Sequence, residues 1–211
     1  GSLYVTAGAL VLGVPIGLLT AVFLSRFASP RMVKLLKPAV QLLAGIPSVV
    51  YGFFGLVVVV PLTTGRGSML AACIILGIMI LPTIISVSES SLNAVESSYY
   101  EGALALGATH EHAVFSVVLP AAKSGVLAAV ILGVGRAIGE AMAVIMVAGN
   151  QPRMPQGLLK GLRTLTTNIV MEMGYSADLH REALIATAVV LFVFILLINL
   201  LFSLTKRRKK S

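Results

Sequence analysis

The sequence predicts an all-α integral membrane protein with five spanning helices. Hydrophobic residues fill 57% of the 211 positions and only 11% are charged, whereas soluble domains carry about 25% charged residues. The apolar residues are also gathered into five blocks, each close to the roughly 20 residues that a helix needs to cross a bilayer. These blocks are 3–24, 39–60, 69–87, 125–148 and 183–204.

The basic residues are divided unequally between alternate loops. Of the sixteen Lys and Arg residues, ten lie in one set of loops and in the tail KRRKK at 206–210, and five lie in the opposite set. Because basic residues favour the cytoplasmic side, we expect a cytoplasmic C-terminus and an external N-terminus. The tail is interpreted as an anchor beside anionic lipid. The net charge of +8 is thus a topology signal, and no nucleic-acid partner is expected.

Proline and glycine interrupt the first two blocks. Pro15 is expected to kink the first span. In the second block Gly45 and Pro47 lie well inside the apolar run, where they weaken a helix and leave backbone polar groups without partners. Two interpretations stay open: a kinked packing helix, or an unwound segment beside a translocation path. In the second interpretation, Ser48 and Tyr51 are candidate path residues.

The segment 88–124 is too polar to span a membrane and predicts two helices joined by a glycine turn. Gly107 is placed to end the first helix, and Thr109 to cap a second helix that ends before Pro120. His110 and His112 point away from each other on a helix, which predicts a solvated face and no metal site. The apolar stripe of the first helix comprises Leu92, Val95, Tyr99, Ala103 and Leu106.

The segment between the fourth and fifth blocks, 149–182, carries an apolar stripe of its own. Its members are Leu158, Leu162, Leu165 and Ile169. Their helical spacing predicts an amphipathic helix lying on the membrane surface or against an external partner.

Residue patterns for catalysis are missing from the sequence. The single cysteine, Cys73, lies in an apolar block, which predicts a small buried hydrophobe. No G-x-x-x-x-G-K-[ST] motif occurs, so ATP hydrolysis would have to belong to another chain. We therefore expect a non-enzymatic subunit without a cofactor or a metal.

A motif in the segment 89–120 resembles the EAA loop of ABC importer permeases. Glu101-Gly102-Ala103, three residues, Gly107, nine residues and Val117-Val118-Leu119-Pro120 follow the spacing of that pattern. Gly102 replaces alanine and Val117 replaces isoleucine. The resemblance implies that 89–120 is a cytoplasmic coupling loop that fits a cleft on an ATP-binding subunit. The residues that it implies for coupling are Glu101, Gly102, Ala103, Gly107, Leu119 and Pro120.

Two longer stretches resemble the permease of the phosphate-specific ABC importer, in particular its PstC-type subunit. They are LLKPAVQLLAGIPSVVYGFFGLVVVVPL and GRAIGEAMAVIMVAGN, and the similarity runs over essentially the whole chain. It implies that 1–211 is one type I importer transmembrane domain, usually preceded by a further helix, in a bacterial inner membrane. The implied partners are a homologous permease forming a heterodimer, an ATP-binding dimer and an extracytoplasmic phosphate-binding protein.

Arg136 and Glu140 place two charges near the middle of the fourth block. A charge at mid-membrane costs about 2.5–3.5 kcal/mol on insertion scales, so this depth indicates a face turned to water or solute. Residues four apart share a helix face and can pair. Our hypothesis is that Glu140 holds Arg136, which contacts a passing anion; the family resemblance implies the same role. In the alternative interpretation, the pair only fixes helix packing.

Two other functions remain open at this stage. A permease of the same class could transport another oxyanion, such as sulfate or molybdate. A secondary transporter of a different class could use Glu140 as a proton-coupling carboxylate and would need no ATP.

Overall fold

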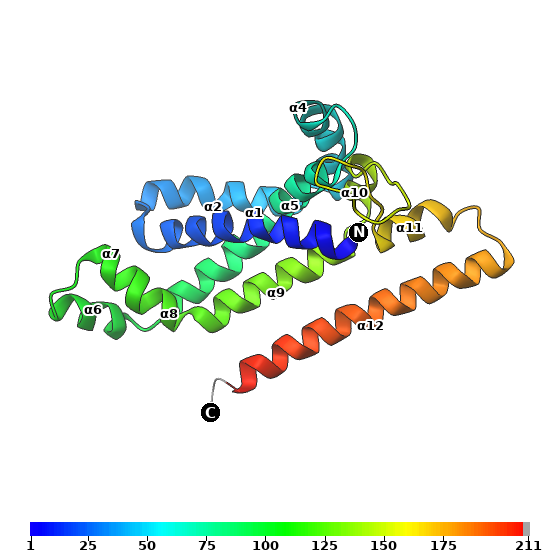
Figure 1. The fold of residues 1–211 in the computed structure, drawn as a ribbon. Helices are drawn as coiled ribbons and strands as arrows, with labels where there is room; N and C mark the ends of the chain where they lie inside the picture. The colour runs from blue at the N-terminus through cyan, green and yellow to red at the C-terminus, as the bar shows by residue number, and fades with distance from the viewer. Residues whose placement is uncertain (209–211) are drawn as a thin grey trace. The chain divides into compact units, whose positions relative to one another are not determined.

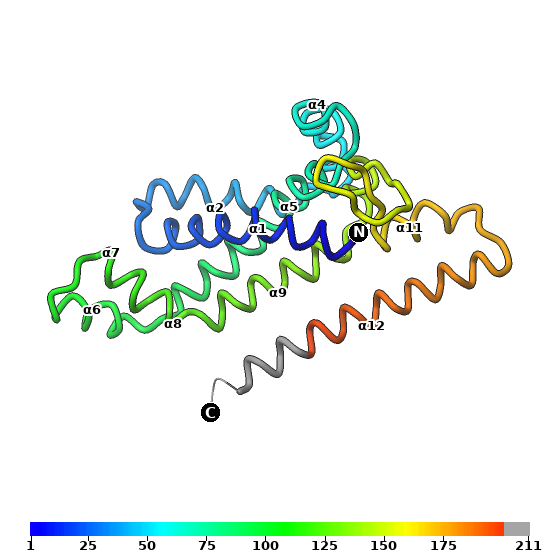
Figure 2. Tube along the Cα trace, viewed as in Figure 1, coloured from blue at the N-terminus to red at the C-terminus, as the bar shows by residue number. Residues whose placement is uncertain are grey.

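The computed structural model describes residues 1–208, with side chains up to residue 200, and its regular secondary structure is helical apart from one isolated bridge between Gly149 and Leu162 (Figure 1). Figure 2 traces the same path as a tube from the N-terminus to the long last helix, α12 (Asp178–Arg208). The tail side chains lie outside the described part, so the lipid-anchor interpretation stays a prediction.

Three helices are long and apolar enough to cross a membrane, over Ser2–Phe27, Met69–Asn93 and Asp178–Leu200. Two pairs of shorter helices pass the same test only as pairs. They are Pro30–Gly45 with Ser48–Thr63, and His110–Ala121 with Lys123–Gly139. The predicted total of five spans is therefore reached when each pair counts as one span. The break after Gly45 agrees with one of the two interpretations that the sequence left open for the second block.

The chain forms two compact units. The first unit comprises Gly1–Leu12, Ile46–Ile80 and the chain from Val134 on. Its elements are the start of α1 (Ser2–Val22), α3 (Ser48–Phe54), the π-helix η2 (Gly55–Val59), α4 (Val60–Thr63), the start of α5 (Met69–Asn93), the end of α9 (Lys123–Gly139), α10 (Met142–Val147), α11 (Leu165–Glu172) and α12.

The N-terminus of α5 is capped by backbone carbonyls from distant parts of the first unit. The first N–H groups of a helix have no partner within it. Here the Met69 N–H donates to the Lys160 carbonyl at 3.0 Å and the Leu70 N–H to the Leu158 carbonyl at 2.8 Å. The Ala71 N–H donates to the hydroxyl of the fully buried Ser68 at 3.3 Å. The segment 149–182 thus completes a helix that begins about ninety positions earlier in the sequence.

Between α10 and α12 the chain forms an extended loop followed by a short helix. The predicted amphipathic helix through Leu158 and Leu162 is wrong, because only α11, from Leu165 on, is helical. Leu162 is instead buried, and its N–H donates to the Ala148 carbonyl at 3.0 Å. Helical spacing in the sequence coincided here with a loop whose hydrogen bonds go to other segments.

The second unit comprises Gly13–Gly45 and Leu81–Gly133. Its elements are the rest of α1, the π-helix η1 (Phe23–Phe27), α2 (Pro30–Gly45), the rest of α5, α6 (Ser97–Ala105), α7 (His110–Ala113), the π-helix η3 (Val114–Val118), α8 (Leu119–Ala121) and the start of α9. Its buried core contains Ala21, Val22, Leu92, Val114, Val118 and Ala122.

The helix-turn-helix predicted within 88–124 is present as α6 and α7, and we call residues 97–121 the hairpin (Figure 1). Gly107 makes the turn with φ +90°, a conformation that glycine adopts without a Cβ penalty. The Thr109 hydroxyl accepts the His112 N–H at 3.3 Å, which confirms the predicted cap. Leu92 belongs to the end of α5 and not to the first hairpin helix, so the predicted stripe began too early.

Pro120 does not end the second hairpin helix. The helix passes through the π-helix η3, where each N–H bonds to the carbonyl five residues earlier instead of four. It then continues into α8, which has Pro120 in its first turn. The chain then bends by 68° between α8 and α9.

Candidate functional site

The second apolar block is divided at Ile46 and Pro47. α2 ends at Gly45, Pro47 has extended backbone with ψ 141°, and α3 starts at Ser48. This is an interruption of the helix, as expected for glycine and proline two positions apart. It places Ser48 in the first turn of α3 and Tyr51 one turn further on. Tyr51 is buried and Ser48 half-buried.

α3 lies directly against α10 because both helices present small residues at the contact. A Cβ built on Gly52 would stand 2.8 Å from the Met146 sulfur and 2.9 Å from the Ala143 Cα. A Cβ on Gly55 would stand 2.7 Å from side-chain carbons of Ile75 and Val147. The two glycines therefore set the separation of α3, η2 and α10.

Replacing Gly52 with alanine is expected to destabilise the first unit by about 1–3 kcal/mol, the usual cost of inserting a methyl group into a filled core. The Met146 side chain can move, but the Ala143 backbone cannot, so α3 would have to shift. Thermal inactivation of the purified transporter in detergent measures this effect. Val50→Ala, on the exposed face of α3, is the control, and equal stability of the two variants would contradict the prediction.

The fourth apolar block is interrupted at Glu140. α9 ends at Gly139 and α10 starts at Met142, so the predicted continuous helix through 125–148 is wrong. The Glu140 carboxylate accepts the Ala143 N–H at 3.1 Å and so caps α10. The Glu140 carbonyl accepts the hydroxyl of Thr166, a buried residue of α11, at 2.9 Å. The Ala143 N–H is thus held by a local side chain, and the Glu140 carbonyl by a side chain that is distant in the sequence.

Arg136 lies in the last turn of α9 and is half-buried. Tyr51 lies on α3 in the same compact unit. Because α9 ends before Glu140, Arg136 and Glu140 do not share one continuous helix face, and their pairing stays a prediction. The part of these residues in a path stays a prediction.

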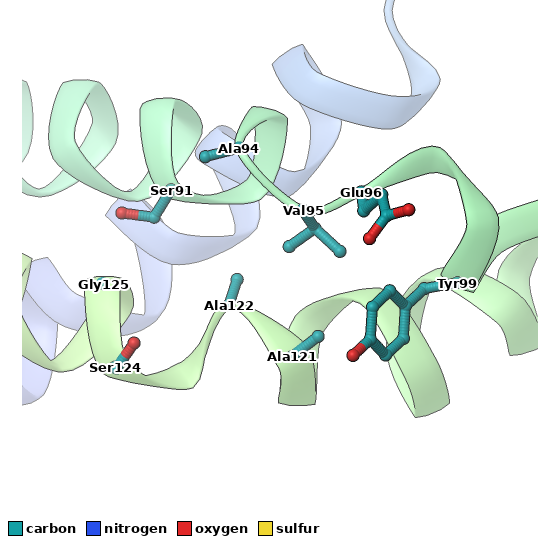
Figure 3. A pocket seen from close by; sticks show the side chains of 9 residues that line it. All are labelled: Ser91, Ala94, Val95, Glu96, Tyr99, Ala121, Ala122, Ser124 and Gly125. Atoms are coloured by element: carbon teal, nitrogen blue, oxygen red, sulfur yellow. The ribbon is translucent and has the colours of Figure 1, made fainter. Parts of the chain in front are cut away.

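The coupling candidates fall into two groups on the hairpin. Glu101, Gly102 and Ala103 lie on α6 beside the Gly107 turn, where Leu106 is 92% exposed. Leu119 and Pro120 lie on α8, at the base of the hairpin. An open cavity of about 390 Å³ at that base is lined by Ser91, Ala94, Val95, Glu96, Tyr99, Ala121, Ala122, Ser124 and Gly125 (Figure 3).

Three kinds of similarity bear on this arrangement. Residues 13–211 match the family described as "Binding-protein-dependent transport system inner membrane component". The chain belongs to this family. It is 42% identical over 221 residues to "Probable ABC transporter permease protein YqgH" of Bacillus subtilis (strain 168), covering 99% of this chain and 71% of the relative. This permease is also 32% identical over 240 residues to "Phosphate transport system permease protein PstC" of Xylella fastidiosa (strain 9a5c), and the match covers 100% of this chain and 74% of that relative.

The fold of the permease is that of solved ABC importers. It superposes on a chain of "Inward facing conformations of the MetNI methionine ABC transporter: CY5 native crystal form" with a TM-score of 0.79 and 21% identity, covering 99% of this chain and 94% of that chain. The permease is therefore a PstC-type subunit of an ABC importer with the type I fold, located in the inner membrane with several passes. Its family works with an ATPase and a substrate-binding protein.

Sequence reasoning missed the groups that hold the interruption at Glu140. Gly139 was the available signal, because glycine is a poor helix residue, but the apolar pattern continues on both sides of it. Thr166 could not be found from the local sequence, since it lies 26 positions further along.

Proposed function

We propose that the permease transports phosphate, with Arg136, Glu140, Ser48 and Tyr51 contributing to its path. The observation that carries the proposal is the 32% identity to a phosphate transport permease over the full chain. Arginine suits this substrate because its planar, permanently charged guanidinium can donate two parallel hydrogen bonds to phosphate oxygens.

The interruption at Glu140 adds a physical reason for a path at this place. A continuous helix satisfies its own backbone groups and offers none to a solute, whereas a break in the membrane is tolerated where it lies within protein or lines a polar cavity. The end of α9, the Glu140 carboxylate and the hydroxyls of Tyr51 and Ser48 would then offer polar groups in an apolar surrounding. Arg136 supplies the positive charge that an anion needs.

The coupling function is assigned to the hairpin, with 89–120 as the segment that docks on an ATP-binding subunit and 1–211 as one transmembrane domain. Support comes from its exposed apolar end, where Leu104 and Leu106 are 39% and 92% exposed, and from the small residues Gly102 and Ala103 beside them. A cytoplasmic position for the hairpin and the C-terminus agrees with the distribution of basic residues.

The remaining partners follow from the PstC-type relationship. In this proposal the permease pairs with a homologous permease subunit, the two dock on two copies of the ATPase, and an external phosphate-binding protein delivers the substrate. Hydrolysis takes place on the ATPase, and the permease acts by changing conformation.

Substrate competition in vesicles containing the complete transporter tests the choice of phosphate. Uptake of labelled phosphate is expected to require ATP and to fall at least tenfold with a hundredfold excess of unlabelled phosphate. The same excess of sulfate or molybdate is expected to leave uptake unchanged. Competition by sulfate would indicate the other-oxyanion function, and ATP-independent uptake driven by a proton gradient would indicate a secondary transporter.

A further inference from the structure

A cluster of polar and aromatic side chains joins the hairpin to the rest of the second unit. We call Arg26, Phe27, Tyr100 and His110 the His110 cluster. The Tyr100 hydroxyl lies 2.7 Å from His110 Nδ1, and the Arg26 carbonyl lies 3.1 Å from His110 Nε2. His110 is half-buried, so the prediction that it lies on a solvated face is wrong. His112, which is exposed, fits that prediction.

The partners of His110 select one form of its neutral ring. A backbone carbonyl only accepts, so Nε2 must carry the proton that is donated to Arg26. Nδ1 is then an acceptor, and Tyr100 donates its hydroxyl proton to it. The His110 side chain lies on α7 and bonds to Tyr100 on α6, so it joins the two hairpin helices. Through the Arg26 carbonyl it also connects them to η1, at the end of the first span.

Arg26 extends the connection to the end of α5. Its guanidinium donates to the Leu92 carbonyl at 2.7 Å, and the neighbouring Ser25 hydroxyl donates to the Asn93 side-chain oxygen at 2.6 Å. The Leu92 carbonyl is among the last of α5, where it also accepts the Val95 N–H at 3.4 Å and where a positive charge is favourable. One short segment, Ser25 to Phe27, therefore contacts both the hairpin and α5.

Aromatic rings pack beside the polar contacts. The Phe27 and His110 rings meet edge to face with centroids 4.7 Å apart, and Phe115 of η3 lies 6.2 Å from Phe27. The buried core of Val22, Leu92 and Val118 belongs to the same unit. Apolar contacts are non-directional and allow packed helices to slide past each other, whereas hydrogen bonds require defined distances and angles. The His110 cluster therefore fixes the orientation of the hairpin relative to η1 and α5.

We propose that the His110 cluster is the link through which movement of the hairpin is passed to the inner ends of α1 and α5, with His110 and Tyr100 as positioning residues. The inference rests on the proposed coupling function of the hairpin. If the link is weakened, the ATPase still moves the hairpin but less of that movement reaches the spans. The expected effect is more ATP hydrolysed per phosphate transported, without loss of docking.

The test measures this ratio in vesicles containing the complete transporter and its binding protein. His110→Ala is expected to raise the ATP hydrolysed per phosphate at least threefold, and Tyr100→Phe about twofold. His110→Gln is expected to recover part of the loss, because its amide can still donate to the Arg26 carbonyl. Tyr4→Phe, which removes an exposed hydroxyl near the start of α1 and outside the hairpin, is the matched control and is expected to leave the ratio unchanged.

A cross-link from Leu106→Cys to the ATPase separates this proposal from the proposed function. If the cross-link forms in all variants and the ratio is unchanged in His110→Ala, the link is overturned. A lower yield of assembled transporter with an unchanged ratio also overturns it, since it shows a role in stability only. Should His110→Ala not assemble, Tyr100→Phe decides alone. Failure of the cross-link with His110 and Tyr100 intact counts against hairpin docking itself.

Discussion

Replacing Arg136 with glutamine is expected to lower the rate of phosphate uptake at least tenfold while the transporter still assembles. A hydrogen bond to a charged group contributes about 1.5–3 kcal/mol, and each 1.4 kcal/mol is a factor of ten in rate. Glutamine keeps a polar side chain of similar reach but removes the charge and the bidentate geometry. Initial rates of labelled phosphate uptake, normalised to assembled transporter, measure the effect.

Arg153→Gln is the matched control for this experiment. Arg153 is an exposed arginine in the loop between α10 and α11, and its replacement is expected to leave the uptake rate within about twofold, since surface substitutions have small effects. Normal assembly together with normal uptake by Arg136→Gln would refute a path role for Arg136. A reduced yield of transporter with unchanged uptake per assembled complex would instead favour the interpretation that Arg136 only fixes helix packing.

Replacing Gly149 with alanine is expected to destabilise the first unit by about 3 kcal/mol, adding backbone strain to a steric overlap. Gly149 has φ +77°, and a Cβ there would stand 2.7 Å from the Gly67 carbonyl oxygen and 3.2 Å from the Gly161 Cα. All the neighbours are backbone atoms. They cannot change rotamer to make room, and the Ser68 N–H to Val147 carbonyl bond at 2.9 Å fixes their separation.

The half-life of transport activity at a fixed elevated temperature measures this effect, and Gly149→Ala is expected to shorten it severalfold. Gly174→Ala is the control, because a Cβ at Gly174 meets no atom of the described chain within 4 Å and its φ is not positive. Equal half-lives for the two variants would show that the contact between residues 67 and 149 is not as close as the structure has it.

The spans and the hairpin could be predicted because their signals are local. Long apolar runs identify spanning segments, and Gly107 followed by Thr109 specifies a turn and a cap within three residues. The end of α2 at Gly45 was likewise marked by nearby residues. In each case the physical cause is a property of one residue and its immediate neighbours.

The candidate site depended on contacts that the sequence does not display. Tyr51 and Arg136 are 85 positions apart, and Glu140 is held by Thr166 from another helix. His110 was assigned to solvent because His110 and His112 point away from each other on a helix, whereas its partner Arg26 lies 84 positions earlier. Tertiary partners decided these cases. The continuation of the helix past Pro120 follows a local π-helix instead, which amino-acid composition does not signal.

The capping of α5 has a consequence for biogenesis. Ribosomes deliver the chain from its N-terminus, so α5 enters the bilayer before its acceptors at Leu158 and Lys160 have been made. Until those residues have been made and have folded back onto the start of α5, the Met69 and Leu70 amides must be solvated by water or headgroups. Docking of the 149–164 stretch is thus the event that lets the third span settle, and maturation of the first unit has to await it.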